Sequence, residues 1–223
     1  MRAIVAADIH GDREALLRLK DSVIEKGVDY FMLLGDYSAG FKDPVQNEED
    51  IRFMMELLRD FKVKAVPGNC DQKDALKILD EYGANLHNTV LELPEVAFVG
   101  FGGSNPTPFG TPFEMPEDET YAQLKEMMTS VKGRRVVMLV HQPPKDTACD
   151  VIKSGAHVGS ASLRKIIEEH HPELVLCSHI HEAAGREDRI GKTRVINVGR
   201  ISEGRAYMLD VGDQGVKIDF YIG

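Results

Sequence analysis

Carboxylate, imidazole and amide side chains follow five separate apolar runs of this sequence, each at the point where the run ends. These side chains are ligand types that divalent transition metals accept in proteins. A single Asp or His after an apolar run is usually a helix cap, a turn former or a packed side chain, but five such positions together favour a metal site. The segments that carry them are Asp8–Asp12, Gly35–Asp36, Gly68–Asp71, His141 and Ser178–His181.

The apolar runs alternate with helical patterns, which is typical of βαβ units and a largely parallel sheet. Because ligands of open α/β sheets bind beyond the carboxyl ends of the strands, we expect the polar segments to meet there. The predicted strands are Ala3–Ala7, Tyr30–Leu34, Lys62–Val66, Val96–Phe101, Arg135–Val140 and Glu173–Cys177. The predicted helices are Arg13–Lys26, Glu48–Phe61 with Asn47 as cap, Asp71–Tyr82, Glu117–Lys132 and Ser160–His170.

The last part of the chain has only short strand-like runs separated by glycine turns, which predicts an antiparallel meander. Its runs are Arg189–Ile190, Thr193–Val198, Arg205–Val211 and Val216–Ile222. No internal repeat, low-complexity tract or long linker divides the sequence, so we expect a single domain over residues 1–223.

The segment Gly102–Pro116 has four prolines and three glycines in fifteen residues. That composition excludes a regular helix or a central strand, and ordered loops of this length are usually functional. The alternatives are a surface connection and a lid over the site, and Phe109 and Phe113 favour the lid. We expect this loop to shape substrate choice without supplying metal ligands.

These motifs resemble the calcineurin-like metallophosphoesterase superfamily, whose pattern is D-x-H, G-D, G-N-H-[DE], H and G-H-x-H. The resemblance extends from Asp8 to His181 and is closest to compact prokaryotic phosphoesterases related to the cyclic-nucleotide phosphodiesterase branch. It implies an α/β fold, a four-layer α/β/β/α sandwich with two mixed β-sheets, which agrees with the alternation of elements.

The resemblance also implies two divalent metal ions bridged by Asp36. The ligands would be Asp8, His10, Asp36 and His181 for one ion, and Asp36, Asn69, His141 and His179 for the other. Four histidines among seven ligands favour Mn²⁺, Fe, Zn²⁺ or Ni²⁺, and we expect Mn²⁺ for activity. The expected catalytic residues are Asp36, Asn69 and His141.

Two positions depart from the family pattern. Ser178 stands where the last motif usually has Gly, and Cys70 stands where the third motif usually has His. In many family members that His faces the leaving oxygen, so the source of the departing group's proton is open here. Asp12 and Asp71 each precede a predicted helix, where capping is the expected role and orientation of a ligand is the alternative.

Substrate contacts are expected from Asn69, His157 and Arg200. Arg200 lies just beyond a predicted strand and is either a bidentate phosphate clamp or an exposed turn residue. His157 precedes a predicted helix, where the segment could bind an anion or place His157 as a proton donor, unless Ser160 is only a cap.

Composition restricts the partners of the chain. The formal net charge of −9, from 36 acidic and 27 basic residues, opposes binding to duplex nucleic acid. The longest apolar runs have five residues, too few for a membrane span, and no secretory signal is visible. Three widely spaced cysteines fit reduced thiols in the cytoplasm. The expected partner is a small phosphorylated substrate. The sequence is compatible with a monomer and with a homo-oligomer.

The sequence therefore predicts a dinuclear metal-dependent phosphoesterase that hydrolyses phosphodiesters or small phosphomonoesters through a metal-activated hydroxide. The alternative is a catalytically weak binding or scaffold module with the same fold. A protein without catalysis would have no reason to keep seven mutually repelling ligands, which disfavours the alternative. The replacement of the usual His by Cys70 is the feature that supports it.

Overall fold

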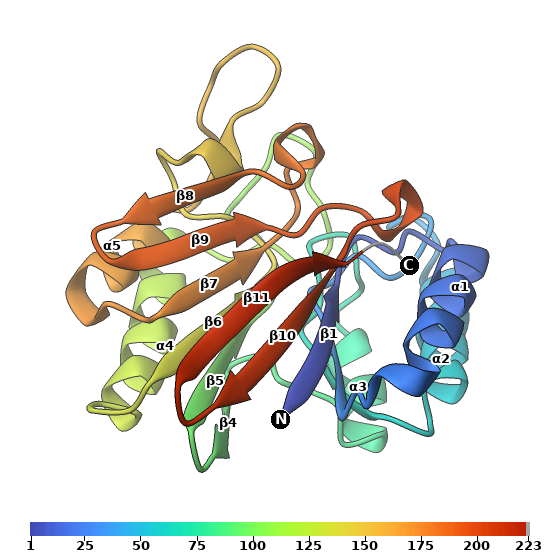
Figure 1. Cartoon of the computed structure of the whole chain (residues 1–223). Coiled ribbons are helices and arrows are strands. Elements are labelled where there is room, and N and C mark those ends of the chain that lie inside the picture. The colour runs from blue at the N-terminus through green and yellow to red at the C-terminus, as the bar shows by residue number, and fades with distance from the viewer. Residues whose placement is uncertain (222–223) are drawn as a thin grey trace.

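The computed structural model describes residues 1–221 as two β-sheets packed face to face, with helices on both outer faces (Figure 1). The first sheet has the strand order β11 (Gly215–Tyr221), β10 (Ala206–Gly212), β1 (Arg2–Ala6), β2 (Tyr30–Leu33) and β3 (Lys62–Ala65). The second has the order β4 (Thr89–Leu93), β5 (Val96–Phe101), β6 (Val136–Val140), β7 (Leu174–Cys177), β9 (Thr193–Asn197) and β8 (Glu187–Ile190).

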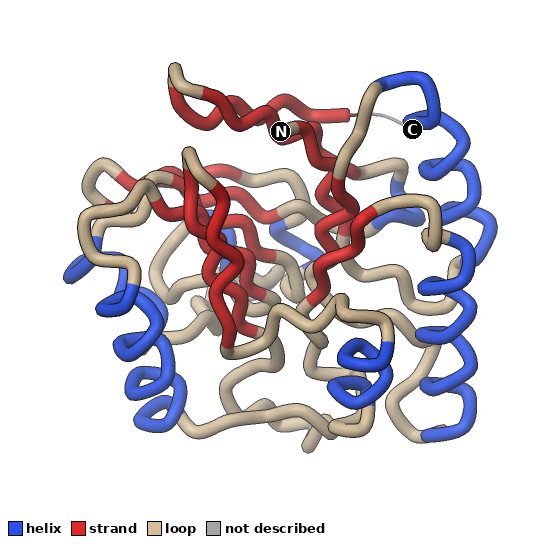
Figure 2. The backbone as a smooth tube through the Cα atoms, turned by 90° about the horizontal axis from the view of Figure 1, so that it is seen from below, coloured by secondary structure: helices blue, strands red, loops and turns tan. Residues whose placement is uncertain are grey.

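Both sheets are mixed. Parallel pairs join β1, β2 and β3 in one sheet and β5, β6, β7 and β9 in the other, and antiparallel strands complete the edges. Two groups of helices lie on opposite sides of the strands (Figure 2). The first group is α1 (Arg13–Val23), α2 (Pro44–Leu57) and α3 (Ala75–Glu81), and the second is α4 (Glu117–Ser130) and α5 (Ala161–His170). The predicted four-layer α/β/β/α sandwich is confirmed.

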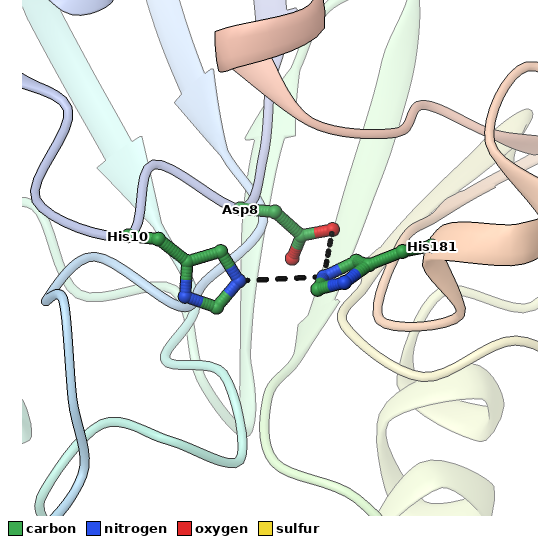
Figure 3. Close-up of side chains that lie close together, drawn as sticks. All are labelled: Asp8, His10 and His181. Carbon is green, nitrogen blue, oxygen red and sulfur yellow. Dashed lines mark hydrogen bonds and ion pairs between the residues drawn. The ribbon is translucent and has the colours of Figure 1, made fainter.

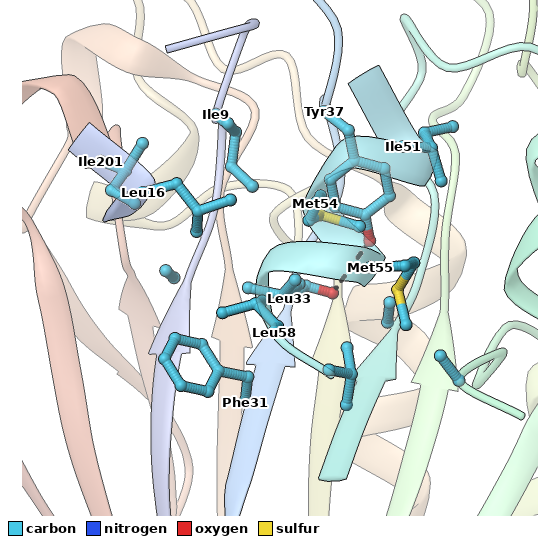
Figure 4. Packing of buried hydrophobic residues seen from close by; sticks show 14 of the residues in the cluster. Ile9, Leu16, Phe31, Leu33, Tyr37, Ile51, Met54, Met55, Leu58 and Ile201 are labelled. Atoms are coloured by element: carbon cyan, nitrogen blue, oxygen red, sulfur yellow. Dashed lines mark hydrogen bonds between the residues drawn. The ribbon is translucent and has the colours of Figure 1, made fainter. Parts of the chain in front are cut away.

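Three apolar layers hold these elements together, because side chains alternate between the two faces of each strand. Val5 and Met32 pack between the sheets, whereas Ile4 and Phe31 pack under the first group of helices. Figure 4 shows this second layer, where Phe31 lies near Leu58 of the segment that follows α2. Strands covered on both faces read as continuous apolar runs, which explains why their positions were predictable.

Several element boundaries differ from the prediction. Helix α2 begins at Pro44 with Asp43 as its cap, because a proline fits the first helical position and the Asp43 side chain accepts N–H groups of Val45 and Gln46. Helix α3 begins only at Ala75, so Asp71 does not cap it. Strand β4 was not predicted, because it is a half-exposed edge strand with little apolar contrast.

The C-terminal segment does not form one meander. Strands β8 and β9 pair in the second sheet, whereas β10 and β11 pair in the first. Strand β9 lies parallel to β7, and the chain then crosses between the sheets before β10 pairs with β1. The predicted last strand ended at Ile222, which lies outside the described residues. Within residues 1–221, none of the helices has the length and apolar character that a bilayer crossing needs.

Candidate metal centre

Six of the seven predicted metal ligands form two groups. Within each group, one donor atom per residue lies within 4.8 Å of the others, and the groups are Asp8, His10 and His181, and Asp36, His141 and His179. Asn69, the seventh, joins the second group through its Oδ1, which lies 3.0 Å from His141 Nε2.

Asp36 lies between the two groups. Its Oδ2 is 3.8 Å from His10 Nε2 and 3.5 Å from His141 Nε2, so one carboxylate oxygen faces a histidine of each group. Figure 3 shows the first group, in which the perpendicular rings of His10 and His181 point ring nitrogens toward each other beside the Asp8 carboxylate. The two Nε2 atoms are 3.3 Å apart.

Each group contains an atom whose lone pair is free to bind a cation. His141 Nδ1 lies 2.6 Å from the Leu34 carbonyl oxygen, so Nδ1–H donates to that oxygen and Nε2 presents its lone pair to Asn69 and Asp36. In the first group, Asp8 Oδ1 is buried without a hydrogen-bond partner among the described residues. A divalent ion would satisfy these atoms, so the residues present fit the two metal ions that the sequence motifs imply.

Burial and local charge set the protonation of the ligands. Burial lowers the pKa of His10, and burial together with the charge of His141 lowers the pKa of His179 to about 4. Burial alone would raise the pKa of Asp8, but the hydrogen bond with His181 and the charge of His141 hold that pKa below its usual range. Burial would lower the pKa of His141, but the charges of Asp36 and Asp8 raise it above its usual value. His10 and His179, with lowered pKa values beside an ionised carboxylate, are suitable for metal binding.

Four of the seven ligands have a left-handed backbone conformation that side chains other than glycine rarely adopt. The φ angles are +49° for Asp8, +45° for His10, +54° for Asp36 and +68° for His179. Such conformations cost on the order of 1–3 kcal/mol each and concentrate at functional sites, where the surrounding structure maintains them.

The backbone at Asp36 is held by Asp71 and by two glycines. Asp71 accepts N–H groups from Asp36 at 2.9 Å and from Gly68 at 2.7 Å, and its other oxygen accepts the N–H of Tyr37 at 2.9 Å. A Cβ atom at Gly68 would lie 2.1 Å from Asp36 Oδ1, and one at Gly35 would lie 2.2 Å from Gly68 N, so only glycine allows this approach. Burial and the charge of Asp36 raise the pKa of Asp71 to about 7. Asp71 is therefore a positioning residue and not the predicted helix cap, whereas Asp12 does cap α1 through Ala15 N–H.

We expect Asp71→Asn to weaken both folding and metal binding, because an amide N–H would replace an oxygen that faces backbone N–H groups. The free energy of unfolding should fall by about 2–4 kcal/mol, which lowers Tm by roughly 5–10 °C in a chain of this size. Metal affinity should fall about 10–100-fold. Asp74→Asn is the matched control, because Asp74 is exposed and pairs only with Lys77 among the described side chains. Equal Tm and metal affinity in the two variants would contradict this role of Asp71.

Two further contacts orient the ligands. Thr111 Oγ1 accepts the Asn69 side-chain N–H at 3.0 Å, which directs Asn69 Oδ1 toward His141. Ser178, which replaces the usual glycine, donates its hydroxyl to Asp8 Oδ2. No local pattern indicates the Thr111 contact, because Thr111 lies 42 residues from Asn69 in the proline-rich loop.

Five of the seven predicted metal ligands line a cavity of about 640 Å³, namely His10, Asp36, Asn69, His179 and His181, and the proline-rich loop forms part of its wall. Phe109 is on that wall and is 76% exposed. Phe113 does not line the cavity; it is 5% exposed and packs against the His87 ring at a centroid distance of 5.0 Å. Only one of the two phenylalanines expected in a lid therefore faces the site.

Cys70 lines the same cavity, and burial together with the negative charge of Asp36 raises the pKa of its thiol. The thiol therefore stays protonated at neutral pH.

The two predicted substrate contacts outside the metal ligands do not line the cavity. His157 Nδ1 is 2.6 Å from Asp150 Oδ1, and this hydrogen bond raises the pKa of His157. Its neighbour Val158 does line the cavity. Arg200 pairs through its backbone with Ala7, and its Nε is buried with no partner among the described residues. The positive charge of Arg200 is one of the causes, after burial, that lower the pKa of His10.

Comparisons with known proteins show the family and the fold of the chain. The family model described as calcineurin-like phosphoesterase matches residues 1–183. A protein of Methanocaldococcus jannaschii, described as uncharacterized, is 35% identical over 202 residues, which cover 88% of this chain and 87% of that protein. The crystal structure of the Thermus thermophilus protein TT1561 has a TM-score of 0.73 and 20% identity over 98% of each chain. A dimetal phosphatase from Danio rerio has a TM-score of 0.70 and 11% identity, covering 99% of this chain and 95% of that chain.

Proposed function

The chain belongs to the calcineurin-like phosphoesterase family, and we propose that it is a dinuclear metal-dependent phosphoesterase acting on phosphodiesters or small phosphomonoesters. The observation that carries the proposal is the position of the Asp36 carboxylate between two groups of donor atoms. We also propose that residues 1–223 form one domain that works in the cytoplasm. The three cysteines, all free, support that location.

Asp8, His10, Asp36 and His181 would hold one divalent ion, and Asp36, Asn69, His141 and His179 would hold the other. When bound, two such ions lower the pKa of a water molecule and stabilise the charge that develops on the phosphoryl group. Mn²⁺ is the proposed ion for activity, because imidazole and carboxylate ligands together suit Mn²⁺.

Two bound ions, rather than the protein's own groups, would give this site the positive charge that attracts a phosphate. The only formal negative charges among the seven ligands are those of Asp8 and Asp36, because Asn69 and the imidazoles are neutral. Two divalent ions would therefore leave the centre positive within a chain of net charge −9. A phosphate would be attracted locally although the overall field repels it.

The orientation of Asn69 leaves a donor for the substrate. One side-chain N–H donates to Thr111, and an amide group has a second N–H that can donate to a phosphoryl oxygen. We propose Asp36, Asn69 and His141 as the catalytic residues, with Asn69, His157 and Arg200 as substrate contacts. The unpartnered Nε of Arg200 within the described chain supports its part in this assignment.

Hydrolysis of a chromogenic diester and a chromogenic monoester tests the proposal. Protein treated with chelator should be inactive toward both esters, and added Mn²⁺ should restore turnover of at least one. A protein that binds metal but hydrolyses neither ester would instead be the weak binding or scaffold module. Cyclic nucleotides, dinucleotides and sugar phosphates, assayed next, would rank the substrates.

A further inference from the structure

The cavity extends well beyond the space that a phosphate group needs. Its volume of about 640 Å³ is in the range of sites that bind whole organic ligands, about 300–1,000 Å³. The metal ligands form one end. The remaining wall comes from five separate segments and is largely apolar, with side chains that include Phe41, Pro106, Pro108, Phe109, Ile152 and Val158.

Charged groups on this wall disfavour a second anion. Of the described residues that line the cavity, none is Lys or Arg. Apart from the predicted metal ligands, Glu182 is the one charged residue among them. A second phosphate or a carboxylate on the substrate would leave water without a cationic partner and would lie in the same cavity as Glu182.

Several hydrogen-bond donors of the proline-rich loop are already paired with other residues of the protein. The hydroxyl groups of Thr107 and Thr111 both donate to Glu114 Oε1, each at 2.6 Å. The Asn105 backbone N–H donates to Gln142 at 2.6 Å. The polar residues of the wall therefore stabilise the loop, and what they leave open to a ligand is mainly apolar surface.

We propose that this wall is a specificity subsite for an uncharged apolar group, of about the size of an aryl ring, on the phosphoester substrate. The proposal rests on the proposed function, because the metal centre would bind the phosphoryl end. Phe109 is its main contact, since its exposed ring can stack on an aromatic group. Compounds with a second anionic group are selected against.

Binding of phosphonates tests this subsite without a catalytic step, because phosphonates keep the anionic end and are not hydrolysed. We expect Mn²⁺-loaded protein to bind phenylphosphonate about tenfold more tightly than methylphosphonate in calorimetry. A carboxylate at the para position of the phenyl ring should weaken binding at least threefold. These ratios compare ligands in one preparation, so a partial metal load affects both members of each pair.

Variants locate the subsite. Phe109→Ala should reduce the phenyl-to-methyl affinity ratio about fivefold and leave methylphosphonate binding unchanged. Phe220→Ala is the matched control, because Phe220 is 48% exposed on β11 and does not line the cavity; it should change neither affinity. Val158→Lys should restore binding of the carboxylated compound, since it places a cation on the wall.

A phenyl-to-methyl ratio near one, no detectable binding of phenylphosphonate at millimolar concentration, or equal losses for both phosphonates in Phe109→Ala would each overturn the subsite. A different result would contradict the proposed function: no ester would be hydrolysed with Mn²⁺, whatever the phosphonate affinities are. Equal affinity for phenylphosphonate and methylphosphonate, in a protein that hydrolyses esters with Mn²⁺, would contradict only the subsite.

Discussion

Asp36→Asn should remove most hydrolytic activity, lowering kcat/KM on the order of 10³-fold or more. Among the residues that the structure describes, Asp36 is the one carboxylate that faces histidines of both groups, at 3.8 Å and 3.5 Å, so its charge would be lost to both ions at once. Loss of several kcal/mol of charge stabilisation at the transition state corresponds to that factor. Steady-state kinetics with a chromogenic ester, together with elemental analysis of bound metal, measures both effects.

His10→Ala is the comparison for this variant, because His10 belongs to one group only. It should empty mainly one metal position and leave the other occupied, whereas Asp36→Asn lowers the occupancy of both. Near wild-type turnover with two bound ions in Asp36→Asn would show that the dinuclear assignment is wrong.

The second large effect concerns the leaving group of the ester. A positioned general acid typically contributes about 10²–10⁴-fold when the departing alkoxide is a poor leaving group. Cys70 occupies the place of the usual histidine, and its raised pKa makes the thiol a weak proton donor. The wild type should therefore cleave esters of acidic phenols far better than esters of simple alcohols. A plot of log kcat/KM against leaving-group pKa should have a steep negative slope when chemistry limits the rate.

Two variants identify the proton donor. Cys70→His should flatten the slope if the introduced imidazole reaches the departing oxygen. His157 is the competing donor, because its hydrogen bond to Asp150 raises its pKa and its neighbour Val158 lines the cavity. A shallow wild-type slope that steepens in His157→Ala would make His157 the acid, and a shallow slope in both proteins would point to water or another donor.

The positions of the seven predicted ligands were accessible to sequence analysis because of the strands that precede them. Fully buried strands appear as short apolar runs, and the first polar residues after each run must emerge at the same edge of a parallel sheet. Asp8 after β1 and His141 after β6 follow this rule directly. The four-layer fold was also predictable, because the family that the motifs resemble has that fold.

Other features depend on contacts between distant segments, which no local pattern records. The left-handed backbone of Asp36 requires Gly68 and Asp71, more than 30 residues away, to approach it. Asp71 had the sequence context of a helix cap, but its carboxylate accepts backbone N–H groups of another loop. Phe113 and Phe109 looked equivalent in the loop, and only tertiary packing against His87 shows that Phe113 is structural.

The number of metal ions that full activity requires is the most direct measure of the dinuclear centre. Chelator-treated protein is titrated with Mn²⁺, and bound metal and ester hydrolysis are followed in the same samples. We predict that activity rises until two ions are bound per chain and then stays constant. Full activity with one ion per chain, or two bound ions without any ester hydrolysis, would contradict the account.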